Sequence, residues 1–205
     1  MKNKKRISKT VQAEPELIKV KKAITAKKVS DRKIYPIGQF EYDEEYAKKH
    51  IQKNIDDIRE MPKILKTVLK QINKHNKQNS YREGGWTIEQ IIHHLADAHM
   101  NGFIRFKLAL TESNPVVKPY DENLFAETSE VFLSGLKSSY YILKGIQKRW
   151  AVLLKNMDDN DFKLGFIHPD DNKKYTLLYV LAKYAWHGKH HIEQIKVALE
   201  SVSED

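Results

Sequence analysis

Four long segments of this 205-residue chain repeat their apolar residues every three or four positions, and this spacing is the strongest constraint on the fold. The pattern predicts helices over about residues 43–76, 88–111, 132–157 and 177–201. Each such helix has one apolar face that another element must cover. We see no convincing strand. The sequence therefore predicts an all-α domain, and a single four-helix bundle is its simplest architecture.

Local signals refine the ends of these helices. Pro62 lies inside the first pattern and predicts a kink or a split there, because proline lacks a backbone N–H. Thr87 and Gln90 have the spacing of a capping box at the start of the second helix. A long polar connection follows that helix, over about residues 113–130, and its length favours a functional lid.

The formal net charge of +9 belongs to the N-terminal part of the chain. Residues 1–33 carry twelve Lys or Arg and three acids, whereas the other 172 residues carry 24 of each. Lysine-rich segments without aromatic residues seldom bury enough apolar surface to fold. We therefore expect a basic, disordered extension over residues 1–33 and the bundle over residues 34–205. Because the bundle is neutral, specific binding to nucleic acid is not expected.

The absence of cysteine excludes disulfides, thiolate metal sites and a cysteine nucleophile. If a thiol takes part in the chemistry, it belongs to a small molecule. No apolar run approaches the roughly 20 residues of a membrane span. The charged first residues lead into no hydrophobic segment of the kind found in secretion signals. We therefore expect a cytoplasmic protein with no membrane partner.

The segment WHGKHHIEQI holds three of the nine histidines within five residues. At about 100° per residue, His187 and His191 lie one turn apart beside the apolar face of the last helix. His190 points away from that face, and we expect it in solvent. Two imidazoles spaced i, i+4 can bind one metal ion. The alternative is a pair of buried histidines satisfied by hydrogen bonds, and a third histidine in the right place would favour the metal.

The second helix offers three candidates for that third ligand in the segment IIHHLADAHM. His99 falls near the middle of the apolar stripe, His94 on one flank and His93 on the other side. Periodicity favours His99 as the most buried of the three. A metal site between two helices could equally use a flanking residue such as His94, so the spacing leaves the choice open.

Several separated segments resemble the DinB superfamily of four-helix bundles, and within it the YfiT branch, described as metal-dependent hydrolases or bacillithiol S-transferases. The segments are YREGGWTIEQIIHHLADAHMNGFIRFKLALTE, PYDEN and WHGKHHIEQI. The likeness runs from YPIGQF, near Tyr35, to the final helix and leaves out the basic extension. It implies that His94, His187 and His191 are the metal ligands, and that the protein forms a homodimer.

Three neutral imidazoles leave at least one coordination position open, as in catalytic metal sites. We expect one divalent ion, zinc first, with nickel, iron or manganese also suited. Such an ion can lower the pKa of a bound water to about 7 or deprotonate a bound thiol. The resemblance favours transfer of a bacillithiol-like thiol to an electrophile, such as an epoxide or a halogenated compound. The alternatives are hydrolysis by metal-bound hydroxide and a non-catalytic stress protein that binds a metal or a small molecule.

Four further residues are candidates for roles around the metal. Asp97 follows His94 by three positions and could orient a ligand or a substrate, although a surface aspartate would look the same. Arg105 lies further along the same helix face and could hold an anionic arm of the thiol, or form an ordinary salt bridge. Tyr81 and Arg82 lie in the glycine-containing loop and could line the rim of a substrate pocket.

Overall fold

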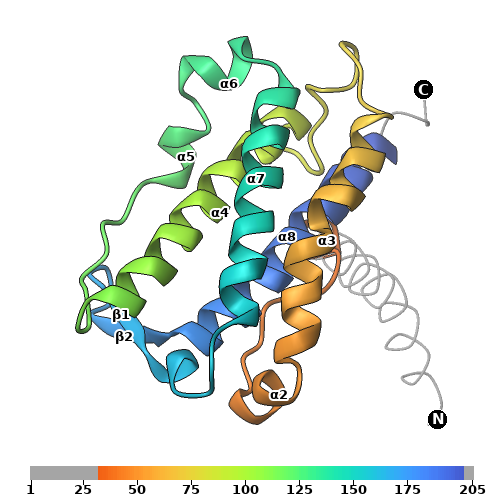
Figure 1. Ribbon diagram of the computed structural model, residues 1–205. Coiled ribbons are helices and arrows are strands. Elements are labelled where there is room, and N and C mark those ends of the chain that lie inside the picture. Colours follow the sequence, from red (N-terminus) through yellow and green to blue (C-terminus); the bar gives the residue numbers. More distant parts are fainter. Residues whose placement is uncertain (1–31, 201–205) are drawn as a thin grey trace, which may run out of the picture.

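Four long helices form the body of the molecule in the computed structural model, which describes residues 32–200 (Figure 1). Both α3 and α4 pack against both α7 and α8, which closes the bundle. The bounds of the long helices are Ile51–Leu69 for α3, Ile88–Thr111 for α4, Leu136–Lys155 for α7 and Leu177–Glu200 for α8. The prediction of a four-helix bundle is confirmed. Residues 1–31 of the expected extension lie outside the described residues.

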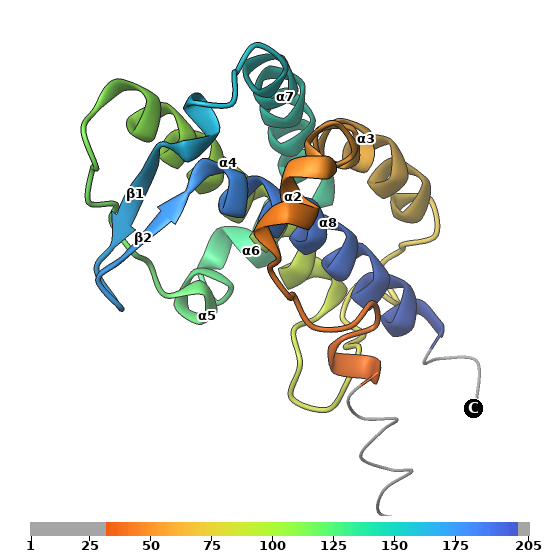
Figure 2. The ribbon, with the colours of Figure 1, turned by 90° about the horizontal axis from the view of Figure 1, so that it is seen from below.

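Shorter elements connect the long helices. They are α2 (Glu44–Lys49), α5 (Glu122–Phe125), α6 (Ser129–Leu133), the 3-10 turn Asp161–Lys163, β1 (Gly165–His168) and β2 (Lys173–Thr176). The prediction of a chain without strands is wrong, because β1 pairs antiparallel with β2 in a hairpin beside the bundle (Figure 2). Each strand has four residues, which is too short for a period of two to stand out in the sequence.

The first predicted helix is divided, but not at the proline. The break falls at His50, whose backbone leaves the helical region with a φ of −116°, and α3 then continues through Pro62 to Leu69. Pro62 is buried inside α3. Its ring removes only the hydrogen bond to the carbonyl four residues earlier, and burial of the helix face offsets that loss. The predicted extension of this helix to residue 76 is also wrong, since turns follow Lys70.

The third predicted helix is also shorter than its apolar pattern. Gly135, with a φ of +67°, separates α6 from α7, so the pattern over residues 132–157 belongs to two helices. The long connection over residues 113–130 contains α5 and the start of α6 rather than continuous loop. Within residues 32–200, no helix combines the length and the apolar character needed to cross a bilayer.

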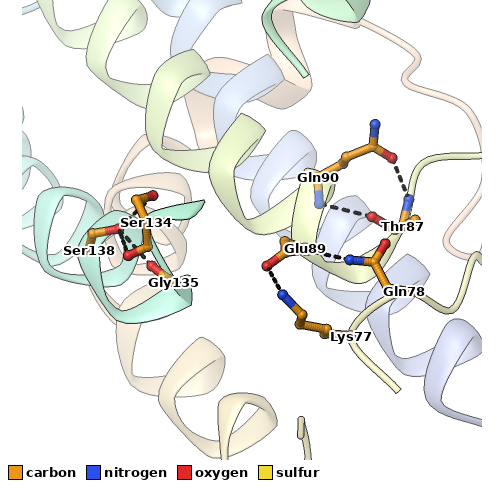
Figure 3. Close-up of polar contacts among 8 residues, drawn as sticks. All are labelled: Lys77, Gln78, Thr87, Glu89, Gln90, Ser134, Gly135 and Ser138. Carbon is orange, nitrogen blue, oxygen red and sulfur yellow. Dashed lines mark hydrogen bonds and ion pairs between the residues drawn. The ribbon is translucent and has the colours of Figure 1, made fainter. Parts of the chain in front are cut away.

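The start of α4 is fixed by polar contacts that the sequence predicts in part (Figure 3). The Oγ1 of Thr87 accepts from the backbone N–H of Gln90 at 3.2 Å, and Oε1 of Gln90 accepts from the backbone N–H of Thr87 at 2.9 Å. Next to this capping box, the buried carboxylate of Glu89 accepts from Lys77 Nζ and from Gln78 Nε2, each at 2.6 Å. These contacts tie α4 to the preceding loop and hold the histidines one and a half turns further along.

Two apolar clusters, here called the end clusters, fill the two ends of the bundle. Large side chains at the hairpin end are Phe103, Phe106, Trp150, Leu177 and Leu181, and those at the other end are Ile88, Ile91, Leu95, Leu143, Ile192 and Ile195. Between them along α4 and α8 lies a group of imidazoles, here called the histidine layer: His94, His99, His187 and His191.

Candidate metal centre

Three members of the histidine layer point their ring nitrogens at one another. The Nε2 atoms of His94 and His187 are 3.2 Å apart. One ligand nitrogen of each of His94, His187 and His191 lies within 4.8 Å of the other two. α4 supplies the first imidazole, and α8 supplies the other two from positions one turn apart. The i, i+4 pair therefore faces its partner across the contact between the two helices.

Hydrogen bonds outside the group constrain the two imidazoles of α8. Nδ1 of His191 lies 2.8 Å from Oε1 of Gln194, an oxygen that can only accept, so the ring hydrogen is on Nδ1 and its Nε2 keeps a free lone pair. The amide nitrogen of Gln194 donates in turn to the backbone carbonyl of Ile34 at 2.9 Å. Nδ1 of His187 lies 3.4 Å from Nε2 of His99.

Burial keeps these imidazoles neutral. It lowers the pKa of His94 to about 4. Burial, followed by repulsion between neighbouring imidazoles, lowers the pKa values of His187 and His191 well below 6.5. Only a neutral imidazole can bind a metal, because protonation uses the lone pair. The centre therefore holds its ligands in the binding form well below neutral pH.

The arrangement fits a divalent cation. Two imidazole nitrogens at about 2.0–2.1 Å from a tetrahedral zinc ion are about 3.3 Å apart, close to the 3.2 Å between His94 and His187. Three histidines supply three of four tetrahedral positions and leave one for a water or a substrate. The indole of Trp86 contacts the His94 ring, with centroids 4.6 Å apart, and stacks near His191, which covers one side of the group.

The other candidate histidines have different surroundings. His99 is fully buried, as its periodicity predicts, but its ring nitrogens contact Gln147 and His187 instead of joining the three-histidine group. His93 faces away and hydrogen-bonds Ser139 at 2.8 Å. The expectation that His190 lies in solvent is wrong. It is buried and stacks on Trp186 with ring centroids 4.5 Å apart, and Tyr35, in the segment before α2, lies against its ring at 5.9 Å between centroids.

A cavity of about 800 Å³ opens beside His187. It lies between α4, α8, the hairpin and the connection that contains α5, so substrate could reach the metal centre from this side. The side chains around it are mostly aromatic or charged: Arg105, Tyr120, Asp121, Glu122, Phe166, His168, Asp170, Asp171, Tyr175, Tyr179, Lys183 and Tyr184. Burial raises the pKa values of Tyr120 and Tyr184, so both phenols keep their protons and can donate hydrogen bonds.

The four additional candidates from the sequence lie in three different places. Arg105 lines this cavity. Asp97 is half-buried on α4, and burial raises the pKa of its carboxyl, but its side chain does not line the cavity. Tyr81 is buried in the end cluster far from the hairpin, and Arg82 is exposed beside it. The structure thus brings Arg105 towards His187 and leaves Tyr81 and Arg82 outside the cavity wall.

Sequence reasoning missed Gln147, Gln194 and Trp86 as neighbours of the centre. Gln147 lies on the apolar stripe of α7 between Leu143 and Trp150 and is fully buried. A buried amide must find hydrogen-bond partners, so a glutamine on an otherwise apolar stripe is itself a signal of a polar contact inside the bundle. The WHGKHHIEQI segment contains Gln194, but nothing in its spacing identifies its contact with His191.

The fold and the centre together define a four-helix bundle with a three-histidine group that fits a metal ion. A family model described as the DinB superfamily matches residues 43–195. The chain belongs to the DinB superfamily.

Relatives with provisional names point to the same kind of site. A protein of Oceanobacillus iheyensis, provisionally named a metal-dependent hydrolase, is 42% identical over 161 residues, which cover 78% of this chain and 92% of the relative. YfiT of Bacillus subtilis has the same provisional name and is 40% identical over 161 residues, covering 78% of this chain and 90% of YfiT. A solved structure of that YfiT, described as a probable metal-dependent hydrolase with an unusual four-helix bundle topology, superposes with a TM-score of 0.80 at 37% identity and covers 85% of this chain and 99% of that one.

Proposed function

We propose that this protein is a metal-dependent enzyme that transfers a low-molecular-weight thiol to an electrophilic carbon. The observation that carries the proposal is the convergence of His94, His187 and His191, together with the large cavity that His187 lines. A divalent ion held there would supply Lewis-acid chemistry, favouring the thiolate form of a thiol placed at its open position. Zinc suits three imidazoles best, and nickel, iron and manganese are also compatible.

The cavity is large enough to hold a small thiol and a small electrophile together. Its volume of about 800 Å³ lies near the upper part of the range for small-molecule sites, about 300–1,000 Å³. Arg105 and Lys183 bring positive charge to a wall that also holds the carboxyl groups of Asp121, Glu122, Asp170 and Asp171. We propose that Arg105 holds an anionic arm of the thiol. The aromatic side chains of the wall offer flat apolar surface for the electrophile.

The chain's part in this reaction is mainly to position the two partners. The thiol loses its proton, a bond forms between sulfur and the electrophilic carbon, and the bond from that carbon to its leaving atom breaks. With an alkyl halide, the halide ion departs. With an epoxide, the ring oxygen takes up a proton. Tyr120 and Tyr184 of the cavity wall keep their phenol protons, so either could donate a hydrogen bond to that oxygen.

Hydrolysis is the second candidate, and the provisional names of the relatives favour it. The same open position could take water in place of a thiol. Asp97, Tyr81 and Arg82 remain predictions from the sequence, because no contact of these side chains with the cavity supports a role in either reaction.

Product masses distinguish the two reactions. The full-length zinc-loaded protein is incubated with bacillithiol and an alkyl halide or epoxide, and separately with ester and amide substrates. We expect a conjugate whose mass equals thiol plus electrophile, less the hydrogen halide where a halide leaves. Products that gain one water without consuming thiol would instead establish hydrolysis.

Arg105 offers a matched test of thiol binding. Arg105→Met should raise the KM for an anionic thiol about tenfold or more and leave kcat nearly unchanged, because it removes binding common to the ground and transition states. Lys107→Met, on the same helix but outside the cavity wall, is the control and should leave both constants unchanged.

A further inference from the structure

Three side chains from three helices, two of them fully buried and the third half-buried, form a column that leads into the metal centre. Gln147 of α7 lies 2.8 Å from Nδ1 of His99 on α4, and Nε2 of His99 lies 3.4 Å from Nδ1 of His187 on α8. Gln147 and His99 are both fully buried. The column therefore joins a helix that supplies no ligand to the imidazole nearest the cavity.

Hydrogen bonds along this column can run in only two directions. A neutral imidazole carries one hydrogen, so a hydrogen accepted at one nitrogen must be matched by a hydrogen donated at the other. If Gln147 Nε2 donates to His99, then His99 donates to His187, and the hydrogen of His187 lies on Nε2. That atom faces Nε2 of His94 at 3.2 Å and has no lone pair left for a cation.

Metal binding requires the hydrogen bonds of the column to run the opposite way, because only then is the lone pair on Nε2 of His187 free. His187 then carries its hydrogen on Nδ1, donates it to His99 and keeps the Nε2 lone pair free. His99 carries its hydrogen on Nδ1 and needs an acceptor at the place of the Gln147 amide. Turning that amide by 180° presents Oε1 to His99. Oε1 has no hydrogen-bond partner in the present orientation, so the turn costs that oxygen none. The turn does break the weaker contact of Nε2 with Sδ of Met61, at 3.2 Å.

A second buried histidine on α4 also contacts α7, but its hydrogen bonds do not lead to a candidate metal ligand. His93 of α4 and Ser139 of α7 form a buried hydrogen bond of 2.8 Å. The other ring nitrogen of His93, Nε2, is buried without a partner, so this pair ends there. Of the two buried histidine pairs between α4 and α7, the one with Gln147 continues to a candidate ligand and the one with Ser139 does not.

We infer that Gln147 is a positioning residue for the metal: through His99 it selects the tautomer of His187, and metal binding turns its amide so that Oε1 faces His99. This inference rests on the metal centre of the proposed function but not on the reaction catalysed there. Outer hydrogen-bond partners of metal-bound histidines typically change metal affinity by about 10–100-fold.

The test uses cobalt(II), titrated into the full-length protein against a chelator and followed by visible absorption. Gln147→Met, which offers neither a strong acceptor nor a donor, should bind cobalt about 10–100-fold more weakly than the unsubstituted protein. Gln147→Glu, which presents only acceptor oxygens to His99, should restore the affinity or exceed it. Long-range proton–nitrogen NMR of the zinc-loaded protein should show the hydrogen of His187 on Nδ1.

Ser139→Ala is the matched control, because it breaks the other histidine pair between α4 and α7. It should leave cobalt affinity unchanged. Equal affinity for Gln147→Met and the unsubstituted protein, or an equal loss in Ser139→Ala, would overturn the inference. Protein that binds no cobalt at all would overturn the metal centre and the column together. Normal cobalt binding without thiol transfer would overturn only the proposed reaction.

Discussion

The end clusters and the histidine layer of this bundle are built on different physical terms. The end clusters are filled by aliphatic and aromatic side chains, whose burial stabilises the fold by roughly 25 cal/mol per Å² without regard to direction. The histidine layer buries imidazoles, and each ring nitrogen there costs free energy unless a partner is correctly placed. The comparison indicates that the two ends stabilise the bundle so that its middle can be specialised for binding.

Glycines at the histidine layer show how closely the ends enclose it. A Cβ on Gly102 of α4 would lie 2.6 Å from the ring of Tyr184 and 2.7 Å from that of Trp150. A Cβ on Gly188 of α8 would lie 2.7 Å from Sδ of Met61. The rings of Tyr184 and Trp150 and the thioether of Met61 therefore occupy space that a side chain at these two positions would need.

The largest expected effect is a loss of metal affinity when a ligand of the histidine layer is removed. His187→Ala removes one of three ligands, so we expect metal affinity to fall by more than the roughly 100-fold of an outer partner. The free energy of unfolding without added metal should change little. Removing the imidazole loses its packing but also removes the cost of keeping that ring out of water. Metal analysis after dialysis and chemical denaturation measure the two quantities. Full metal retention by this variant would exclude His187 from the site.

The next largest effect is a loss of stability, without a loss of metal affinity, when an end cluster is truncated. Leu181 is fully buried in the cluster at the hairpin end, one and a half turns before His187. Leu181→Ala should lower the free energy of unfolding by about 2–5 kcal/mol through lost burial and a residual cavity. Metal affinity of the folded variant should stay within a few-fold of normal, as judged by cobalt titration. A large loss of affinity would show that the ends also set the geometry of the layer.

Mild acid should lower the free energy of unfolding through the histidine layer, because the apolar side chains of the end clusters carry no group that titrates there. In the unfolded chain histidine takes up a proton near pH 6.5, whereas the pKa of folded His94 is about 4 and those of His187 and His191 are well below 6.5. The unfolded state therefore binds more protons, and without metal the free energy of unfolding falls as pH drops from about 6.5 towards 4. The slope should reach about 1.4 kcal/mol per pH unit for each histidine that stays neutral when folded. Denaturation at a series of pH values measures it, and a flat profile would contradict the burial of these rings.

The smallest effect is expected at His190, and the adjacent ligand His191 serves as its comparison. His190 stacks on Trp186 and its Nδ1 has no partner, so phenylalanine can replace it with a stability change of about 1.5 kcal/mol or less and full metal content. His191→Phe should lose the metal, because the replacement removes the nitrogen that faces His94 and His187. Metal content and thermal denaturation of the two variants give a matched pair. Equal metal loss in both would place His190 in the site.

Much of the fold could be predicted from the sequence because helix periodicity and capping are local signals. The bounds of α4 and the reciprocal bonds of Thr87 and Gln90 agree with the prediction. The errors arose where tertiary burial overrides a local signal, as at Pro62, or where an element is shorter than its own period, as in β1 and β2. His190 was misplaced because the covering of α8 by a distant segment leaves no mark on the helix itself.

The centre was less accessible to local reasoning. Spacing alone identified the pair on α8 and predicted His99 as the most buried histidine of α4, but it left the choice of the third ligand open. His99 is indeed the more buried, yet its Nε2 contacts Nδ1 of His187 and does not join the three-histidine group. Only the family resemblance selected His94, and the contacts of Gln147 and Gln194 depend on helices that meet in three dimensions.

The hydrogen bond from Gln194 to the carbonyl of Ile34 has a practical consequence for handling this protein. It fastens the beginning of the described chain to the residue that orients His191. Shortening the protein from its amino end should therefore preserve the orientation of His191 only if the cut stops short of Ile34.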